Sequence, residues 1–169
     1  MSQATLILGG ARSGKTRRAL EIAVKFKHRI YIATAQARDD EMCARIAHHR
    51  AERGAGWTTI EAPLDLVSAV AGADAPDQVV VIDCLTLWLS NLMEHGRDLT
   101  AETEALIGAL SVGRAQIILV SNEVGLGVVP ETPLGREFRD AQGRLNQRVA
   151  AAASCVEFIA AGLSLRLKG

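Results

Sequence analysis

Residues 9–16, Gly-Gly-Ala-Arg-Ser-Gly-Lys-Thr, fit the pattern G-x-x-x-x-G-K-[ST], which binds the phosphates of nucleoside triphosphates. A short apolar run precedes the motif and a helical pattern follows it, and this is the context that such a loop needs. Glycines let the backbone close around phosphate oxygens, and the next helix adds the positive end of its dipole. We therefore expect Lys15 to reach the β- and γ-phosphates and the hydroxyl of Thr16 to bind Mg²⁺.

A second group that could hold Mg²⁺ is the carboxylate of Asp83, at the end of the apolar run 79–82. In a parallel sheet, a carboxylate at this position lies beside the phosphate loop and can bind Mg²⁺ directly or through water. The alternative is structural, because an Asp at a strand–helix junction often only caps the helix. The predicted metal ligands are Thr16 and Asp83.

Two adjacent histidines, His48 and His49, occur in a helical pattern over 39–54 that opens with acids and closes with arginine. A neutral imidazole is a good nucleophile near pH 7. Adjacent histidines on a polar helix are nevertheless usually solvated. A zinc site is disfavoured, because neighbours in sequence do not have ligand spacing and no cysteine complements them. The residues alone leave a reactive role and a surface role open.

Short apolar runs alternate with longer helical patterns along the chain. The apolar runs predict strands at 5–10, 29–34, 57–62, 78–84, 115–122, 155–162 and 163–169. The helical patterns predict helices at 15–27, 39–54, 99–111 and 133–154, the third with Thr100 as its N-cap and the last with a stripe of Leu134, Phe138, Ala141, Leu145 and Val149. This alternation predicts a three-layer α/β fold of the P-loop (RecA-like) type, with a mostly parallel sheet covered on both faces, in one domain over 1–169.

Composition narrows the class of protein. The 169 residues contain 19 Lys and Arg and 19 Asp and Glu, and this balance argues against a nucleic-acid partner. No apolar stretch approaches the roughly 20 residues of a transmembrane helix, and the N-terminus does not have the pattern of a signal peptide. Three widely spaced cysteines without a CxxC motif indicate reduced thiols. We expect a cytoplasmic protein.

Two further groups of polar residues could serve a site. Asn122 and Glu123 follow the strand 115–122 and begin a glycine-containing loop, which either closes over a large substrate or is an ordinary connection. The next predicted helix contains four arginines: Arg136, Arg139, Arg144 and Arg148. They either bind phosphates or form a solvated or subunit-contacting face paired with Glu137 and Asp140.

Five segments follow one another along the chain in a fixed order. They are the phosphate loop, Thr-Ala-Gln at 34–36, the stretch DDEMCARIAHHR, the run ending in Asp83, and SNEVGLGVVPETPLGREFRDAQGRLNQRVA. In this the chain resembles, over nearly its whole length, the bifunctional adenosylcobinamide kinase/adenosylcobinamide-phosphate guanylyltransferase family of cobalamin biosynthesis. The resemblance implies phosphorylation of adenosylcobinamide by a nucleoside triphosphate. It then implies transfer of GMP from GTP through a guanylylated histidine, which gives adenosylcobinamide-GDP and pyrophosphate. In the family motif that histidine is the first of the pair, His48 here.

The resemblance also implies a set of binding residues. The catalytic residues would be His48 and Lys15, with Mg²⁺ as cofactor, GTP and ATP as substrates, a corrinoid as second substrate, and a homotrimer with sites near subunit boundaries. The implied nucleotide contacts are Gly9, Gly10, Ala11, Arg12, Ser13, Gly14, Lys15, Thr16, Thr34, Ala35, Gln36, His49, Arg50, Ala51, Glu52, Glu61 and Asp83. Asp83 stands where some relatives carry Glu, so a direct metal contact could become water-mediated.

Two other functions compete with this one. A phosphate-loop kinase for a small metabolite would use phosphoryl transfer alone and would give His48 no role. A nucleotide-dependent switch would need an effector segment, and so compact a chain offers none that is distinct. Only the bifunctional enzyme explains the histidine pair together with NEVGLGVVP.

Overall fold

A seven-stranded sheet forms the centre of the computed structural model, which describes residues 4–37 and 40–169. The strand order is β3-β2-β4-β5-β1-β6-β7, and every neighbouring pair is parallel except β6 and β7. The strands are β1 (Ala4–Gly9), β2 (His28–Ala33), β3 (Trp57–Glu61), β4 (Gln78–Asp83), β5 (Gln116–Asn122), β6 (Cys155–Ala160) and β7 (Leu163–Lys168). The strands lie where the sequence predicts them, within one or two residues.

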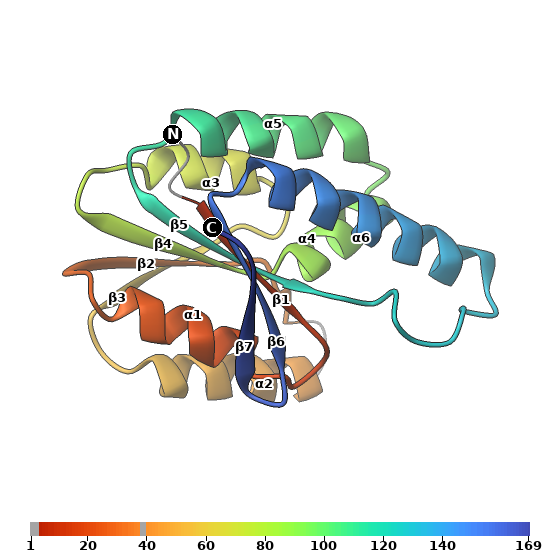
Figure 1. The fold of residues 1–169 in the computed structure, drawn as a ribbon, viewed down its shortest axis with the longest axis horizontal. Coiled ribbons are helices and arrows are strands. Elements are labelled where there is room, and N and C mark those ends of the chain that lie inside the picture. Colours follow the sequence, from red (N-terminus) through yellow and green to blue (C-terminus); the bar gives the residue numbers. More distant parts are fainter. Residues whose placement is uncertain (1–3, 38–39) are drawn as a thin grey trace.

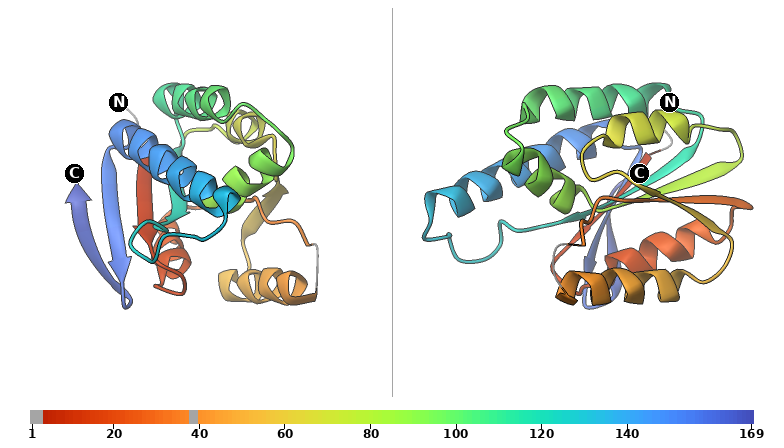
Figure 2. Two further views of the ribbon diagram at one scale, coloured as in Figure 1. Left: turned by 90° about the vertical axis from the view of Figure 1, so that its right-hand side faces the viewer. Right: turned by 180° about the vertical axis from the view of Figure 1, so that it is seen from behind.

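Helices cover both faces of the sheet, as Figures 1 and 2 show. They are α1 (Lys15–Ala23), α2 (Asp40–Arg53), α3 (Leu66–Gly72), α4 (Leu85–Glu94), α5 (Leu99–Val112) and α6 (Pro133–Ala152). In Figure 1, α3, α4, α5 and α6 lie above the sheet, and α1 and α2 lie below it. The predicted three-layer α/β fold is confirmed. No described helix is long and apolar enough to cross a membrane.

The central strands are apolar along most of their length because both of their faces are buried. Val80 and Ile82 of β4 belong to the larger core under α3–α6, whereas Val79 and Val81 belong to the smaller core under α1. Successive side chains of a strand point to opposite faces, so a strand between two helical layers reads as a continuous apolar run.

The structure corrects two predictions about where helices end and how they are capped. Helix α1 ends at Ala23 instead of residue 27. Helix α5 is capped by Asp98 and not by Thr100: the Asp98 carboxylate accepts hydrogen bonds from the backbone N–H groups of Thr100 (2.9 Å) and Ala101 (3.0 Å). Asp is a favoured N-cap because its carboxylate satisfies free N–H groups of the first turn.

The predicted stripe of α6 is only partly in the core. Ala141, Leu145 and Val149 are buried and Phe138 is half-buried, but Leu134 is 66% exposed. In Figure 1 and in the right-hand view of Figure 2, the first turns of α6 and the loop before it project beyond the sheet, so Leu134 has no core to enter.

The parallel register brings four strand ends to one edge of the sheet. Gly9 of β1 pairs with Asn122 of β5, and Ala33 of β2 pairs with Asp83 of β4. Ligands of open α/β sheets bind at this carboxyl edge. The phosphate loop follows β1 directly and therefore opens beside Asp83.

Candidate nucleotide-binding site

The phosphate loop depends on glycine where the chain comes closest to its neighbours. A Cβ on Gly9 would lie 2.4 Å from the carbonyl oxygen of Ile159, so only glycine fits there. Gly14 caps α1 in the left-handed conformation (φ 102°), which glycine adopts without strain. The turn between β6 and β7 supports the loop from outside, because the N–H of Gly162 donates to the carbonyl of Ser13 (2.9 Å).

Lys15 is the buried cation of the loop. Its side-chain nitrogen donates to the carbonyl of Gly10 at 2.5 Å, within the loop itself. Burial lowers the pKa of Lys15, and the nearby Asp83 carboxylate partly offsets that effect. The ammonium group is thus held at the mouth of the loop, and phosphate oxygens could replace the Gly10 carbonyl as its partner.

Asp83 and Thr16 lie together as the sequence predicts. The Thr16 hydroxyl donates to Oδ2 of Asp83 (2.8 Å), and the Tyr31 hydroxyl donates to the same oxygen (2.9 Å). Burial first, and the Asp83 charge second, raise the pKa of Tyr31 far above its ordinary range, so its hydroxyl stays a donor. The capping alternative for Asp83 is not observed, because Cys84 is the N-cap of α4 and that helix has no side-chain cap.

The Asp83 and Thr16 oxygens suit Mg²⁺. Mg²⁺ prefers oxygen ligands and commonly combines one or two protein oxygens with phosphate oxygens and water. Over the residues that the structure describes, no group of three or more His, Cys, Asp or Glu side chains could bind a metal on its own. A metal here would therefore complete its coordination with the nucleotide.

A cavity of about 570 Å³ opens between the phosphate loop and helix α2. It is lined by Ala11, Arg12, Ser13, Gly14, Lys15, Thr16, Arg17, Tyr31, Ala33, Ala35, Ile46, Arg50, Arg53, Thr59, Glu61, Asp83, Cys84, Leu87, Val120 and Asn122. A second cavity of about 490 Å³ adjoins it and shares four of those residues, Ala35, Ile46, Arg50 and Glu61. Ligand pockets of roughly 300–1,000 Å³ are typical of nucleotide-sized ligands.

Most of the predicted nucleotide contacts meet in these cavities. Residues 11–16, Ala35, Arg50, Glu61 and Asp83 line the first cavity, and Gln36 lines the second. Thr34 is instead buried beneath them, where its hydroxyl donates to the Cys84 carbonyl (2.7 Å) and accepts from the Cys84 N–H (2.8 Å). Ala51 is exposed on α2 and lines neither cavity. The side chains of His48, His49 and Glu52 lie outside the described residues.

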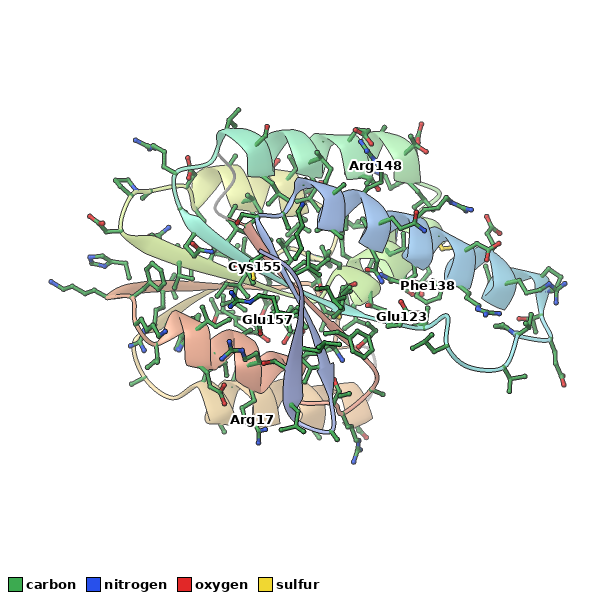
Figure 3. The ribbon with its side chains drawn as sticks, in the orientation of Figure 1. Arg17, Glu123, Phe138, Arg148, Cys155 and Glu157 are labelled. Atoms are coloured by element: carbon green, nitrogen blue, oxygen red, sulfur yellow. The ribbon has the colours of Figure 1, made fainter. Side chains whose placement is uncertain are left out.

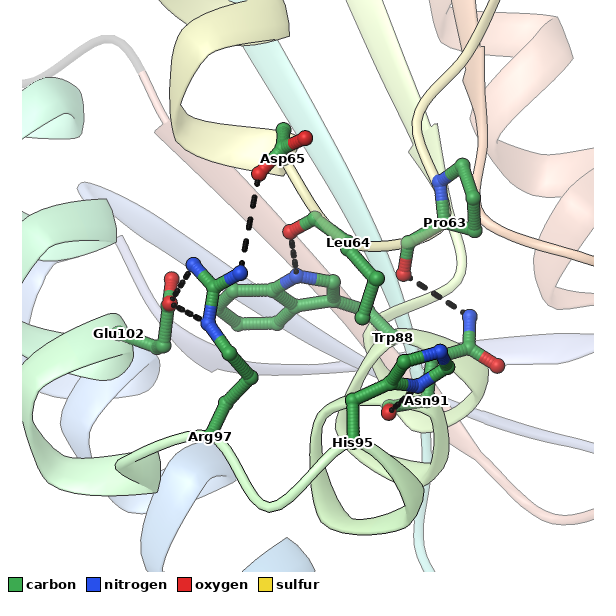
Figure 4. Close-up of polar contacts among 8 residues, drawn as sticks. All are labelled: Pro63, Leu64, Asp65, Trp88, Asn91, His95, Arg97 and Glu102. Atoms are coloured by element: carbon green, nitrogen blue, oxygen red, sulfur yellow. Dashed lines mark hydrogen bonds and ion pairs between the residues drawn. The ribbon is translucent and has the colours of Figure 1, made fainter.

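Sequence reasoning missed three features of the site. Tyr31 and Arg53 line the first cavity, and the Arg53 guanidinium carbon lies 3.7 Å from the centre of the Tyr31 ring. Helix α4 connects the loops after β2 and β3, because the Asn91 amide donates to the carbonyls of Thr34 and Pro63, each at 2.9 Å. Figure 4 shows the bond to Pro63.

The arginines of α6 bind groups of their own chain. Arg136 donates to the carbonyls of Pro130 (3.0 Å) and Glu131 (2.7 Å), and Arg139 donates to that of Gly125 (2.7 Å). These bonds hold the loop before α6, rather than the predicted partners Glu137 and Asp140.

Arg148 forms a half-exposed ion pair with Glu104 of α5 at 2.7 Å, and Figure 3 shows it where α6 lies beside α5. The structure gives no bond for Arg144. Within the described residues, none of the four arginines lines either cavity.

Solved structures that resemble this chain are P-loop NTPases with little sequence identity. The RadB recombinase superposes with a TM-score of 0.54 and 15% identity, over 93% of this chain and 74% of that one. The P4 protein of bacteriophage phi13 gives 0.52 and 13%, over 97% of this chain and 53% of that one. This chain thus spans about half the length of the P4 protein. Together the likenesses show the P-loop NTPase fold of the RecA-like type.

Sequence relatives are far closer. The bifunctional adenosylcobalamin biosynthesis protein CobP of Pseudomonas aeruginosa is 48% identical over 167 residues, which cover 97% of this chain and 96% of that protein. The corresponding protein CobU of Escherichia coli is 40% identical over 178 residues, which cover 96% and 98%. A family model described as cobinamide kinase / cobinamide phosphate guanyltransferase matches residues 5–167. The chain therefore belongs to the bifunctional cobinamide kinase and cobinamide phosphate guanyltransferase family.

Proposed function

We propose that this chain phosphorylates the aminopropanol hydroxyl of adenosylcobinamide with a nucleoside triphosphate, and then transfers GMP from GTP to that phosphate through His48. One observation carries the assignment of both steps to one site. The cavity that the phosphate loop opens is walled on its other side by α2, the helix whose sequence contains the histidine pair.

In the phosphoryl step, Lys15 would exchange its bond to the Gly10 carbonyl for the β- and γ-phosphates. Thr16 and Asp83 would hold Mg²⁺, which when bound neutralises phosphate charge and so favours displacement. The loop glycines bring backbone N–H groups against the phosphates, and these fixed donors stabilise negative charge in the transition state. The corrinoid hydroxyl then attacks the γ-phosphorus, the P–O bond to the leaving nucleoside diphosphate breaks, and the hydroxyl proton leaves to solvent.

In the guanylyl step, a neutral imidazole nitrogen of His48 would attack the α-phosphorus of GTP. A P–N bond forms, the P–O bond to pyrophosphate breaks, and the ring proton leaves to solvent. The phosphate of adenosylcobinamide phosphate then attacks the same phosphorus, the P–N bond breaks as the ring takes up a proton from solvent, and neutral His48 is returned. The covalent GMP–histidine intermediate divides one difficult transfer into two displacements.

The test is covalent labelling with GTP that carries a label at its α-phosphorus. We expect Mg²⁺-dependent label that survives alkali, is lost in acid and maps within residues 44–53 to His48. The His48→Asn variant should take no label, and the matched His49→Asn variant should keep it. Label on His49 would retain the chemistry but move the nucleophile. No label on a protein that binds GTP, with pyrophosphate removed, would leave only the simple kinase.

We further propose that residues 1–169 act as one catalytic domain in a cytoplasmic homotrimer. The family resemblance implies the trimer, and exposed apolar side chains support an interface: Leu126, Val128, Val129 and Leu134 are all more than half exposed. Free cysteines support a reducing compartment.

A further inference from the structure

The described side chains of helix α2 make little apolar contact with the rest of the protein. Of its described side chains, none belongs to either hydrophobic core. Six are exposed, namely Asp40, Cys43, Ala44, Ala47, Arg50 and Ala51, and two are half-buried, namely Ile46 and Arg53. Helices in proteins usually owe their position to a buried apolar face. Among the described side chains of α2, the polar contacts are therefore the ones that fix its position.

Two described arginines near the end of α2 make such contacts. Arg50 forms an ion pair with Glu61 at 3.0 Å, but both side chains are more than half exposed and such pairs hold weakly. Arg53 is more securely placed. Its guanidinium carbon lies 3.7 Å from the centre of the Tyr31 ring, and its Nη2 donates to the Thr59 hydroxyl at 3.3 Å.

Tyr31 connects Arg53 to the carboxylate of Asp83, the proposed Mg²⁺ ligand. It is 3% exposed, so the cation over its ring is partly removed from water, where a cation–π contact is stronger. The Tyr31 hydroxyl and the Thr16 hydroxyl converge on Oδ2 of Asp83. Within the described residues Oδ1 of Asp83 accepts no side-chain hydrogen bond, so it is the oxygen available to a cation.

We propose that Arg53 and Tyr31 are positioning residues for guanylyl transfer. Arg53 fixes the end of α2 on Tyr31, and Tyr31 fixes Asp83 beside Thr16, so the histidine-bearing helix is held in register with the triphosphate site. The inference rests on the proposed role of His48, which precedes Arg53 by five residues, or about 7.5 Å along the helix axis. Because little more than one helical turn separates the two residues, a displacement of Arg53 would also shift the position of His48.

Four variants test this positioning role. Arg53→Met removes the cation but keeps an apolar stem, and Arg53→Lys keeps a cation over the ring. Tyr31→Phe keeps the ring for Arg53 but removes the hydroxyl. Arg114→Met is the matched control, because Arg114 is an exposed arginine before β5, at the opposite edge of the sheet. Thermal unfolding of each variant confirms that it is folded.

The measurements are single-turnover rates of GMP–enzyme formation and of phosphoryl transfer to cobinamide, and the Mn²⁺ affinity of the GTP complex by electron paramagnetic resonance. We expect Arg53→Met to slow GMP–enzyme formation about tenfold or more and phosphoryl transfer far less, and Arg53→Lys to recover most of the loss. Tyr31→Phe should weaken Mn²⁺ binding about threefold or more and slow both steps. The Arg114→Met control should match the wild type.

Equal rates of GMP–enzyme formation in Arg53→Met and wild type would overturn the inference and leave the proposed function intact. An equal slowing of both steps by Arg53→Met would also overturn it, because that pattern indicates general loosening of the site. If Arg53→Met does not fold, the folded Tyr31→Phe variant decides: unchanged Mn²⁺ affinity rejects the link. A wild type that forms no GMP–His48 adduct rejects the proposed function itself.

Discussion

At the scale of single residues, the environment of a thiol decides its reactivity. Cys84 lies in the site, and burial first, then the Asp83 charge, raise the pKa of its thiol to about 11 from an ordinary 9.0. Cys43 is exposed on α2. Because the thiolate is the nucleophile, Cys84 should react with iodoacetamide at pH 7.5 roughly a hundredfold more slowly than Cys43. Peptide mass spectrometry over time measures this, and in urea both should react; comparable rates in the native protein would contradict the assigned burial.

Also at the residue scale, two variants distinguish the effect of the charge of Asp83 from the effect of its side-chain length. Asp83→Asn keeps the size but removes the charge that would hold Mg²⁺, and should lower kcat/KM of the kinase step by about a hundredfold or more, equivalent to about 2.7 kcal/mol. Asp83→Glu keeps the charge and should retain activity within about tenfold, with a higher Mg²⁺ requirement. Steady-state kinetics across a Mg²⁺ titration compare them; an Asp83→Asn enzyme with normal Mg²⁺ dependence would place the metal elsewhere.

At the scale of elements, a buried ion pair fastens β6 to helix α1. Glu157 is 3% exposed, and Arg18 donates to both of its carboxylate oxygens at 2.7 and 2.9 Å. Figure 3 shows Glu157 where the hairpin of β6 and β7 crosses in front of the sheet. Because α1 begins at Lys15, this pair also braces the phosphate loop. Removing one partner of a buried pair typically costs about 3–5 kcal/mol; we expect about 2 for Glu157→Gln, since Arg18 is one-third exposed.

The same pair predicts how stability depends on pH. The hydrogen bonds from Arg18 first, then the charges of Arg18 and Arg166, hold the pKa of Glu157 below its ordinary 4.5. A carboxyl whose pKa is lower in the folded state stabilises the protein above its unfolded pKa and loses that contribution as pH falls through the folded value. Urea unfolding should therefore show a constant gap between wild type and Glu157→Gln from pH 6 to 8 that shrinks below about pH 4.5. A gap independent of pH would contradict the ion-pair explanation.

The hydrogen bonds from Asn91 of α4 to the loops after β2 and β3 should affect nucleotide binding more than the rate of the chemical step. Asn91→Leu leaves the carbonyls of Thr34 and Pro63 without their shared donor in a buried place, at a cost of about 2 kcal/mol in unfolding free energy. The loops that line the second cavity then loosen. We expect the KM for GTP to rise about tenfold while kcat changes less than about threefold. Initial-rate kinetics measure both constants. A fall in kcat with unchanged KM would show that the Asn91 hydrogen bonds do not support nucleotide binding.

Comparison of elements shows what the sequence can and cannot predict. The strands and the phosphate loop follow from local patterns, and the parallel sheet then places Asp83 beside Thr16 without further information. Helix α4 was also within reach, since Leu85, Trp88, Leu89 and Leu92 recur at helical spacing and are buried, yet no element was predicted there.

The Tyr31 and Arg53 contacts were not within reach of sequence reasoning. Tyr31 and Asp83 are 52 residues apart, and Arg53 meets Tyr31 only because of where α2 lies. Local periodicity carries no information on how two helices and a strand end converge.

At the scale of the whole molecule, apolar side chains gather where the chain leaves its own core. The loop before α6 and the first turn of that helix project beyond the sheet, with Val128 96% and Leu126 82% exposed. The edge strand β7 also exposes Leu163, Leu165 and Leu167. Contiguous exposed apolar residues of this kind mark interaction surfaces. The projecting loop is the better anchor, because its backbone is held by Arg136 and Arg139.

We therefore expect light scattering of the purified chain at micromolar concentration to give three times the 18.0 kDa of one chain. Replacing Leu126 with Ser and Val128 with Asp should lower this mass, because burying a charge in an apolar contact is costly. Val112→Ser, at an equally exposed valine on α5, is the matched control and should leave the mass unchanged. A loop variant that keeps the full mass would move the interface to β7, where Leu165→Asp tests it next. A monomeric wild type would reject the trimer altogether.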